Sequence, residues 1–174
     1  MRLFFITILS TVSFFAQDQV TYREYPKVDW SDFHARPPIS NFSASISTGL
    51  SYSWSLATGP NGVQFDYQIE ANLHRDSSWS KYTSGKPQVL KHEQLHYDIT
   101  ELFARKLRKA FSEYKVTKNV KRDIERIYKR IESERNQMQI KYDKETNHSL
   151  ITSKQKEWEF YVANELIEYI EYYK

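Results

Sequence analysis

Lys91-His92-Glu93-Gln94-Leu95-His96-Tyr97-Asp98 is the stretch from which both the fold and the chemistry of this chain can be predicted. Residues four apart on an α-helix lie on the same face, so His92 and His96 can present two imidazole nitrogens to one metal ion. Glu93 lies about 100° further around the helix, where it can reach a water on that metal. This H-E-x-x-H pattern is typical of zinc hydrolases.

The residues around the motif predict a long helix. Ser84-Gly85-Lys86-Pro87 precedes it, and Pro87 suits the first helical position. Apolar residues then recur at helical spacing to about Lys115: Leu95, Ile99, Leu102, Phe103, Leu107, Ala110, Phe111 and Tyr114. The motif therefore lies early in a helix whose apolar stripe packs on the rest of the domain.

The segment Gln17 to Lys81 is predicted to be β-rich. Asn41–Leu56 and Val63–Arg75 both alternate apolar and polar residues, and Gly59-Pro60-Asn61-Gly62 between them is a dense turn signal, so the two runs are expected to form a hairpin. Trp30, Phe33 and Pro37-Pro38 are interpreted as a short strand and a loop that pack aromatics onto the sheet. His34 and His74 are isolated and are interpreted as surface or packing residues.

Two further helices are predicted after the motif. The range 117–140 carries an apolar stripe of about three heptads, which favours a helix packing on its own domain over a coiled coil. The polar range 142–149 is predicted to be a loop, and Thr152-Ser153-Lys154-Gln155 a capping box that starts the last helix. The fold class is therefore α+β: a small antiparallel β-sheet, then a metal-binding helix and two further long helices.

The N-terminus is expected to direct export. Arg2 followed by the apolar run Leu3–Phe15 and the small Ala16 indicates a signal peptide over residues 1–16 that is too short to span a membrane comfortably. Residues 17–174 then form a single domain, secreted or periplasmic, with no integral membrane segment. The net charge of +3 is spread among acidic residues, so no nucleic acid partner is expected.

A catalytic zinc usually has three protein ligands, and the third is less clearly marked here. The chain has no cysteine, and Leu102 stands where a metzincin needs its third histidine. His148 is the one histidine after the motif, and Tyr142 and Asp143 nearby can orient it. Glu113 and Glu125 are the alternatives on the gluzincin pattern.

The chain resembles a bacterial family of uncharacterised domains described as predicted secreted zinc-dependent proteases. The resemblance is carried by residues 30–33, 78–79, 90–99, 142–148 and 155–158, which read WSDF, SW, LKHEQLHYDI, YDKETNH and QKEW. Ser149 stands where that family often has glycine. The resemblance implies a zincin-like fold and peptidase activity.

These features together predict a zinc metallopeptidase that acts on a peptide or protein. Zinc is expected on His92, His96 and His148, with Glu93 as the catalytic base. Supporting or oxyanion-stabilising roles are expected from four neighbours: Tyr97, Asp98, Tyr142 and Asp143. The edge of Val63–Arg75 is a candidate surface for an extended peptide. The alternatives are a non-catalytic exported scaffold that zinc stabilises, and a hydrolase of a non-peptide amide in the cell envelope.

Overall fold

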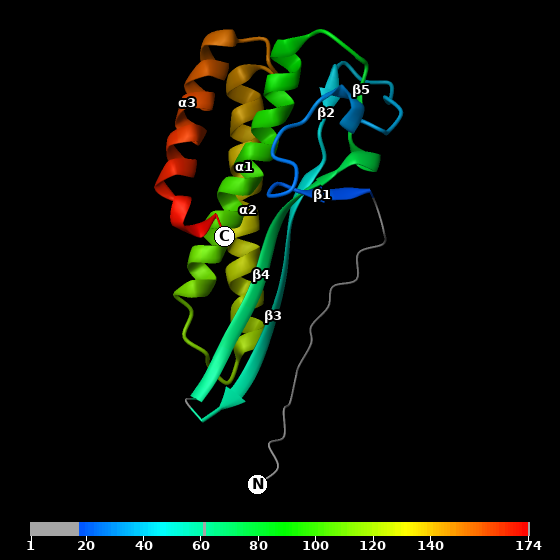
Figure 1. The fold of residues 1–174 in the computed structure, drawn as a ribbon. Coiled ribbons are helices and arrows are strands. Elements are labelled where there is room, and N and C mark those ends of the chain that lie inside the picture. The colour runs from blue at the N-terminus through cyan, green and yellow to red at the C-terminus, as the bar shows by residue number, and fades with distance from the viewer. Residues whose placement is uncertain (1–17, 61, 174) are drawn as a thin grey trace.

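The computed structural model describes residues 18–60 and 62–173, and the predicted signal peptide lies outside this range. Strands come first and helices follow (Figure 1). The strands are β1 Gln19–Thr21, β2 Ala44–Ser45, β3 Thr48–Gly59, β4 Gly62–His74 and β5 Trp79–Ser80. The α-helices are α1 Pro87–Ser112, α2 Val120–Thr146 and α3 Thr152–Glu168, with short 3-10 helices at Trp30–Asp32, Arg75–Ser77 and Ile170–Tyr172. The prediction of small antiparallel sheets with three helices is confirmed.

The predicted hairpin is the long ribbon formed by β3 and β4. The two strands pair antiparallel along their whole length, from Thr48 opposite Leu73 to Gly59 opposite Gly62. β1 pairs with the end of β4, which gives the strand order β1-β4-β3. β2 and β5 form a separate two-stranded sheet. This small sheet positions the chain around β2, which faces the H-E-x-x-H motif.

The core lies between the hairpin and α1, which contacts both β3 and β4 (Figure 1). The strict alternation of β4 places Ile69, Ala71 and Leu73 on buried positions. The stripe of α1 meets them with residues that are almost fully buried: Leu95, Ile99, Leu102, Phe103, Leu107 and Phe111. The apolar periodicity therefore predicts this interface correctly on both sides.

α2 and α3 both pack on α1, and α2 also contacts the hairpin, where the ring of Tyr128 lies 4.7 Å from that of Tyr52. Ile124 and Ile131 of α2 and Trp158 and Val162 of α3 are buried in the same core as the hairpin residues. The prediction that 117–140 packs on its own domain is confirmed. Among the described residues, no helix combines the length and the apolar character that crossing a membrane requires.

The prediction of a loop over 142–149 is wrong for its first half, because α2 continues to Thr146. Tyr142 and Thr146 are completely buried, and they extend the inward face of the helix through a run of charged residues. The helix is followed by its C-cap residue Asn147, the first of three successive residues with positive φ. The capping box at Thr152 is also wrong, because Ile151 is the N-cap residue and makes no side-chain cap.

The segment around Trp30 is a 3-10 helix, so the prediction of a short strand there is wrong. Asp29 accepts hydrogen bonds from the backbone and hydroxyl of Ser31, and Asp32 accepts one from the backbone of Asp29. This reciprocal capping stabilises a tight turn, which the aromatic content of the segment does not indicate.

Candidate metal centre

The motif lies in the second and third turns of α1, on the face turned towards α2. Pro87 occupies the first turn, and the four-residue spacing places His92 and His96 one above the other. His92 is almost fully buried and His96 is partly exposed. Their Nε2 atoms lie 3.3 Å apart, so the two imidazoles converge as the spacing predicts.

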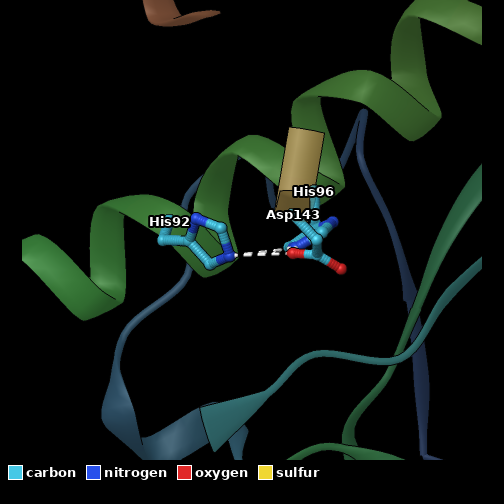
Figure 2. A group of neighbouring side chains, drawn as sticks. All are labelled: His92, His96 and Asp143. Atoms are coloured by element: carbon cyan, nitrogen blue, oxygen red, sulfur yellow. Dashed lines mark hydrogen bonds and ion pairs between the residues drawn. The ribbon is translucent and has the colours of Figure 1, made fainter. Parts of the chain in front are cut away.

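The third member of the converging set is Asp143, from the last two turns of α2 (Figure 2). Its Oδ1 lies 3.1 Å from Nε2 of His92 and 2.9 Å from Nε2 of His96. Ligand atoms bonded to one tetrahedral zinc at about 2.0–2.2 Å are themselves separated by roughly 3.3 Å. Two imidazole nitrogens and one carboxylate oxygen thus have the chemistry and mutual spacing of a zinc ligand set.

His148, which the sequence predicts as the third ligand, lies beside this set rather than in it. Its Nδ1 is 3.5 Å from Oδ1 of Asp143, and its ring centroid is 6.5 Å from that of His92. The ring packs against Phe42 at 4.4 Å and is partly exposed. Asp143 joins the converging set because α2 extends far enough to bring its carboxylate opposite the motif.

The alternative ligands Glu113 and Glu125 are remote from the motif. Glu113 lies 17 residues after His96, which along a helix corresponds to about 25 Å, and it is exposed at the end of α1. Glu125 is exposed near the start of α2 and pairs with Lys129 at 2.6 Å. Neither carboxylate belongs to the converging set.

Glu93 is buried beside the two histidines. Its Oε2 accepts a hydrogen bond of 2.8 Å from the backbone N–H of Ile46, just after β2. Burial raises the pKa of Glu93 above the ordinary value of a glutamate, although His96, His92 and the Ile46 bond lower it. A carboxylate held at a fixed position with a raised pKa is suited to accept a proton near neutral pH.

The charges of the cluster are strongly coupled. Burial raises the pKa of Asp143, but the hydrogen bonds that link it to His92 and His96 outweigh this effect and hold its pKa well below the usual range. Burial lowers the pKa of His96, and the bond to Asp143 together with the charge of Glu93 reverses this, so the net shift is upward. The carboxylate therefore favours a positive charge at this point.

An open cleft of about 660 Å³ leads to these residues. His92, Glu93, His96, Asp143 and His148 all line it. Its other walls are residues 41–46 on one side, residues 147–150 on another, and Tyr82, Lys86, Gln88 and Val89 at the start of α1. The cleft contains no residue of the range 63–75, so the strand edge predicted for a substrate does not border it.

Three other predicted residues lie behind the cleft. Tyr97 is fully buried against Tyr22, and its hydroxyl donates to the carbonyl of Val20. Asp98 accepts hydrogen bonds from Tyr22 and Gln94, and burial raises its pKa.

Tyr142, the third, lies closer to the motif. Its ring stacks on that of His92 at 4.5 Å, and its hydroxyl donates to the side chain of Gln155. Of the three, only Tyr142 contacts a motif histidine, in a supporting position.

Two glutamines that the sequence analysis does not single out meet the outer nitrogens of the histidines. Gln155 Oε1 lies 3.2 Å from Nδ1 of His92, and Gln139 Oε1 forms a short hydrogen bond with Nδ1 of His96. Gln139 precedes Asp143 by four residues, which places the two side chains on the same face of a helix. A prediction that α2 continues through Asp143 therefore also predicts that Gln139 faces α1.

A second group of possible ligands, Asp18, His34 and Asp76, is exposed on another part of the surface. His34 Nδ1 lies 3.3 Å from Asp76 and 3.5 Å from Asp18. His34 is thus the surface residue that the sequence predicts, with acidic neighbours.

The fold and the site describe an α+β protein with a histidine and carboxylate cluster beside a buried glutamate. The chain belongs to DUF922, a family of bacterial proteins of unknown function whose family model matches residues 32–149. This range includes the motif, Asp143 and His148, so the predicted membership of an uncharacterised bacterial family is confirmed. No curated protein and no solved structure matches the chain.

Proposed function

We propose that this protein is a zinc-dependent hydrolase that cleaves amide bonds in peptides, and that it acts outside the cytoplasm after export. The observation that carries the proposal is the convergence of His92, His96 and Asp143 to mutual distances of 2.9–3.3 Å in a cleft that also contains Glu93. The resemblance to predicted secreted zinc-dependent proteases and the zincin-like H-E-x-x-H helix agree with it.

In this proposal His92, His96 and Asp143 hold the metal, and Asp143 replaces His148 as the third ligand. When bound, zinc supplies Lewis acidity that makes water a nucleophile near neutral pH. His148 lies at the wall of the cleft, where its partly exposed ring contacts substrate rather than the metal.

Glu93 acts as the general base. It accepts the proton of the attacking water and returns it to the leaving amine, a role that suits its raised pKa and its fixed position. The N–H of Ile46 keeps the carboxylate in place during both transfers. The substrate lies along residues 41–46, which form the wall of the cleft next to Glu93.

The second candidate function is structural. The three proposed ligands come from α1 and α2, so a bound metal also ties these two helices together. A non-catalytic, zinc-stabilised exported protein would use the same ligands but would not need Glu93 as a base.

The Glu93→Gln variant separates the two functions. The mature protein is loaded with zinc, its zinc content is measured, and cleavage of a mixed peptide library is followed by mass spectrometry. The enzyme is expected to lose at least about 10²-fold in turnover in Glu93→Gln while keeping its zinc and its fold. Glu113→Gln, a remote and exposed glutamate, is the matched control and keeps full activity.

Two results would contradict the proposal. Zinc-loaded wild type that cleaves no peptide favours the structural role or a non-peptide amide, and cell-envelope amides tested with the same protein distinguish these. Undiminished cleavage by Glu93→Gln removes the assigned base.

A further inference from the structure

The outer nitrogen of each motif histidine faces the side-chain oxygen of a glutamine. Gln155, on α3, is buried and accepts from His92, while Gln139, on α2, is half-buried and accepts from His96. An amide can present either its oxygen or its NH₂ group, so the orientation of each glutamine decides which protonation state the imidazole must adopt.

The orientation of Gln155 follows from its other neighbours. Its Nε2 donates to Oε1 of Glu159 at 3.1 Å, and the hydroxyl of Tyr142 donates to its Oε1 at 2.7 Å. An ionised carboxylate can only accept, so the NH₂ group must face Glu159 and the oxygen must face His92. Nδ1 of His92 is therefore the donor.

The orientation of Gln139 is set in the same way by the main chain. Its Nε2 donates to the carbonyl of His96 at 2.9 Å and to Oγ1 of Thr100 at 3.3 Å. A carbonyl can only accept, so the amide oxygen is left to face Nδ1 of His96. His96 thus orients Gln139 through its main-chain carbonyl, and Gln139 in turn orients the imidazole ring of His96.

We infer that Gln139 and Gln155 are positioning residues that hold both imidazoles as the Nδ1–H tautomer when the metal is bound, so that both Nε2 atoms face it together with Asp143. The inference rests on the metal site of the proposed function. Glu159 bonds to the amide of Gln155 and, through that amide, sets which nitrogen of His92 carries the proton.

The Nδ1–H tautomer of both rings explains why the cluster of His92, His96 and Asp143 suits a cation. In the neutral Nδ1–H form, three electron-pair donors lie 2.9–3.3 Å apart with no hydrogen between them. Such an arrangement is unfavourable unless a positive charge lies among them. The glutamine side chains are uncharged, so they fix the orientation of the two rings without changing the net charge that Asp143 gives the cluster.

The tautomers are read directly from the side-chain nitrogen resonances of ¹⁵N-histidine-labelled protein. The zinc-loaded chain is measured, because the metal takes the place of any proton between the two rings and Asp143. Both His92 and His96 are expected to carry the proton on Nδ1 and to bind zinc through Nε2. Zinc bound through Nδ1 of either ring, with the proton on Nε2, overturns the inference, whatever the protein hydrolyses.

Zinc affinity, measured by competition with a chelator, tests the consequence. Gln155→Leu and Gln139→Leu are each expected to weaken zinc binding by roughly 10–100-fold, the range for partners that orient a metal ligand. Gln137→Leu, an exposed glutamine two residues from Gln139 on α2, is the control and leaves the affinity unchanged. The double change Gln155→Glu with Glu159→Gln restores an acceptor at His92 and is expected to rescue binding.

A substitution at Glu159 reverses the direction of the hydrogen bonds of Gln155 without changing either histidine. It therefore distinguishes a positioning role of Gln155 from a role in packing. Glu159→Lys offers a donor to Gln155, which turns the amide and forces a proton onto Nε2 of His92, so zinc affinity falls at least tenfold. Glu157→Lys adds the same charge to the exposed face of α3 and is expected to change little. Equal affinities for these two variants, or unchanged affinity in both leucine variants, contradict the inference. A wild type that binds no zinc contradicts the proposed function instead.

Discussion

Asp143 is the residue at which the candidate metal centre differs most from its sequence-based prediction. The pair His92 and His96 follows from helix geometry alone, because the residues four apart must share a face. A third ligand from another element depends on how two helices meet, which local spacing does not determine. The preference of zinc for imidazole predicts His148, whereas the structure places the carboxylate oxygen of Asp143 2.9–3.1 Å from the Nε2 atoms of both histidines.

Substitutions of the two candidate third ligands are expected to affect zinc affinity to different extents. Asp143→Ala is expected to weaken zinc binding by more than the roughly 10–100-fold that loss of an orienting partner costs. His148→Ala is expected to weaken it less than about tenfold, since its ring lies outside the converging set. Chelator competition on both zinc-loaded variants checks this, and the reverse ranking would restore His148 as the ligand.

His74, at the end of β4, gives a pH dependence of stability. Its Nδ1 is buried with no hydrogen-bond partner among the described residues, and burial lowers its pKa. The unfolded chain therefore binds a proton here at a higher pH than the folded chain does. Stability falls as the pH drops below the unfolded value of about 6.5 towards the lower folded value.

The His74→Gln variant isolates this contribution. Thermal unfolding of wild type and variant, both metal-free, is compared between about pH 8 and pH 5. The wild type is expected to lose stability relative to the variant as the pH falls through this window. A constant difference in melting temperature across the window would show that His74 does not titrate as its burial requires.

At the scale of elements, the helix starts and the hairpin were predictable and the end of α2 was not. Strict alternation and a Gly-Pro-Asn-Gly turn determine β3 and β4, and an eight-residue apolar stripe determines α1. The last turns of α2 carry one aromatic residue among charged ones, so their inward face has no apolar periodicity. Tyr142 and Thr146 face inwards through hydrogen bonds and ring stacking, which hydrophobicity does not report.

The connection after α2 is strained at Ser149. Asn147, His148 and Ser149 have φ values of 46°, 50° and 75°, a region that costs a residue with a side chain about 1–2 kcal/mol. Ser149→Gly is expected to raise the free energy of unfolding by about 0.5–1 kcal/mol after the greater entropy of unfolded glycine is subtracted.

Ser133→Gly is the control for this change, because Ser133 is exposed within α2, where glycine costs roughly 0.5 kcal/mol. Urea denaturation of the metal-free variants measures both. Destabilisation by Ser149→Gly as large as that by Ser133→Gly would show that the connection is not strained in solution.

Across the whole molecule, a buried ionic cluster joins α1 to both the hairpin and the C-terminal segment. Glu101 accepts hydrogen bonds from Arg105 at 2.9 Å and Arg108 at 3.1 Å, and all three are buried. Arg108 also donates to the carbonyls of Ile69 and Tyr172. The helix that carries the motif is therefore held from both sides by charged groups that its apolar stripe does not reveal.

Removing the shared carboxylate takes from Arg105 its closest ionic partner and leaves Arg108 with Glu70 at 3.9 Å. Glu101→Ala is expected to cost about 3–5 kcal/mol in the free energy of unfolding, or to prevent folding. Glu125→Ala removes an exposed partner of Lys129 and is expected to cost no more than about 1 kcal/mol. Urea denaturation compares them, and similar small losses would mean that the cluster does not hold α1.

The central claim is that one metal ion binds His92, His96 and Asp143 beside Glu93, and anomalous diffraction from crystals of the zinc-loaded protein tests it most directly. Data at the zinc absorption edge are expected to show one strong peak within about 2.0–2.2 Å of Nε2 of both histidines and of the Asp143 carboxylate. A peak bonded to His148 without Asp143, a peak only at the exposed group of Asp18, His34 and Asp76, or no peak at all would contradict the claim.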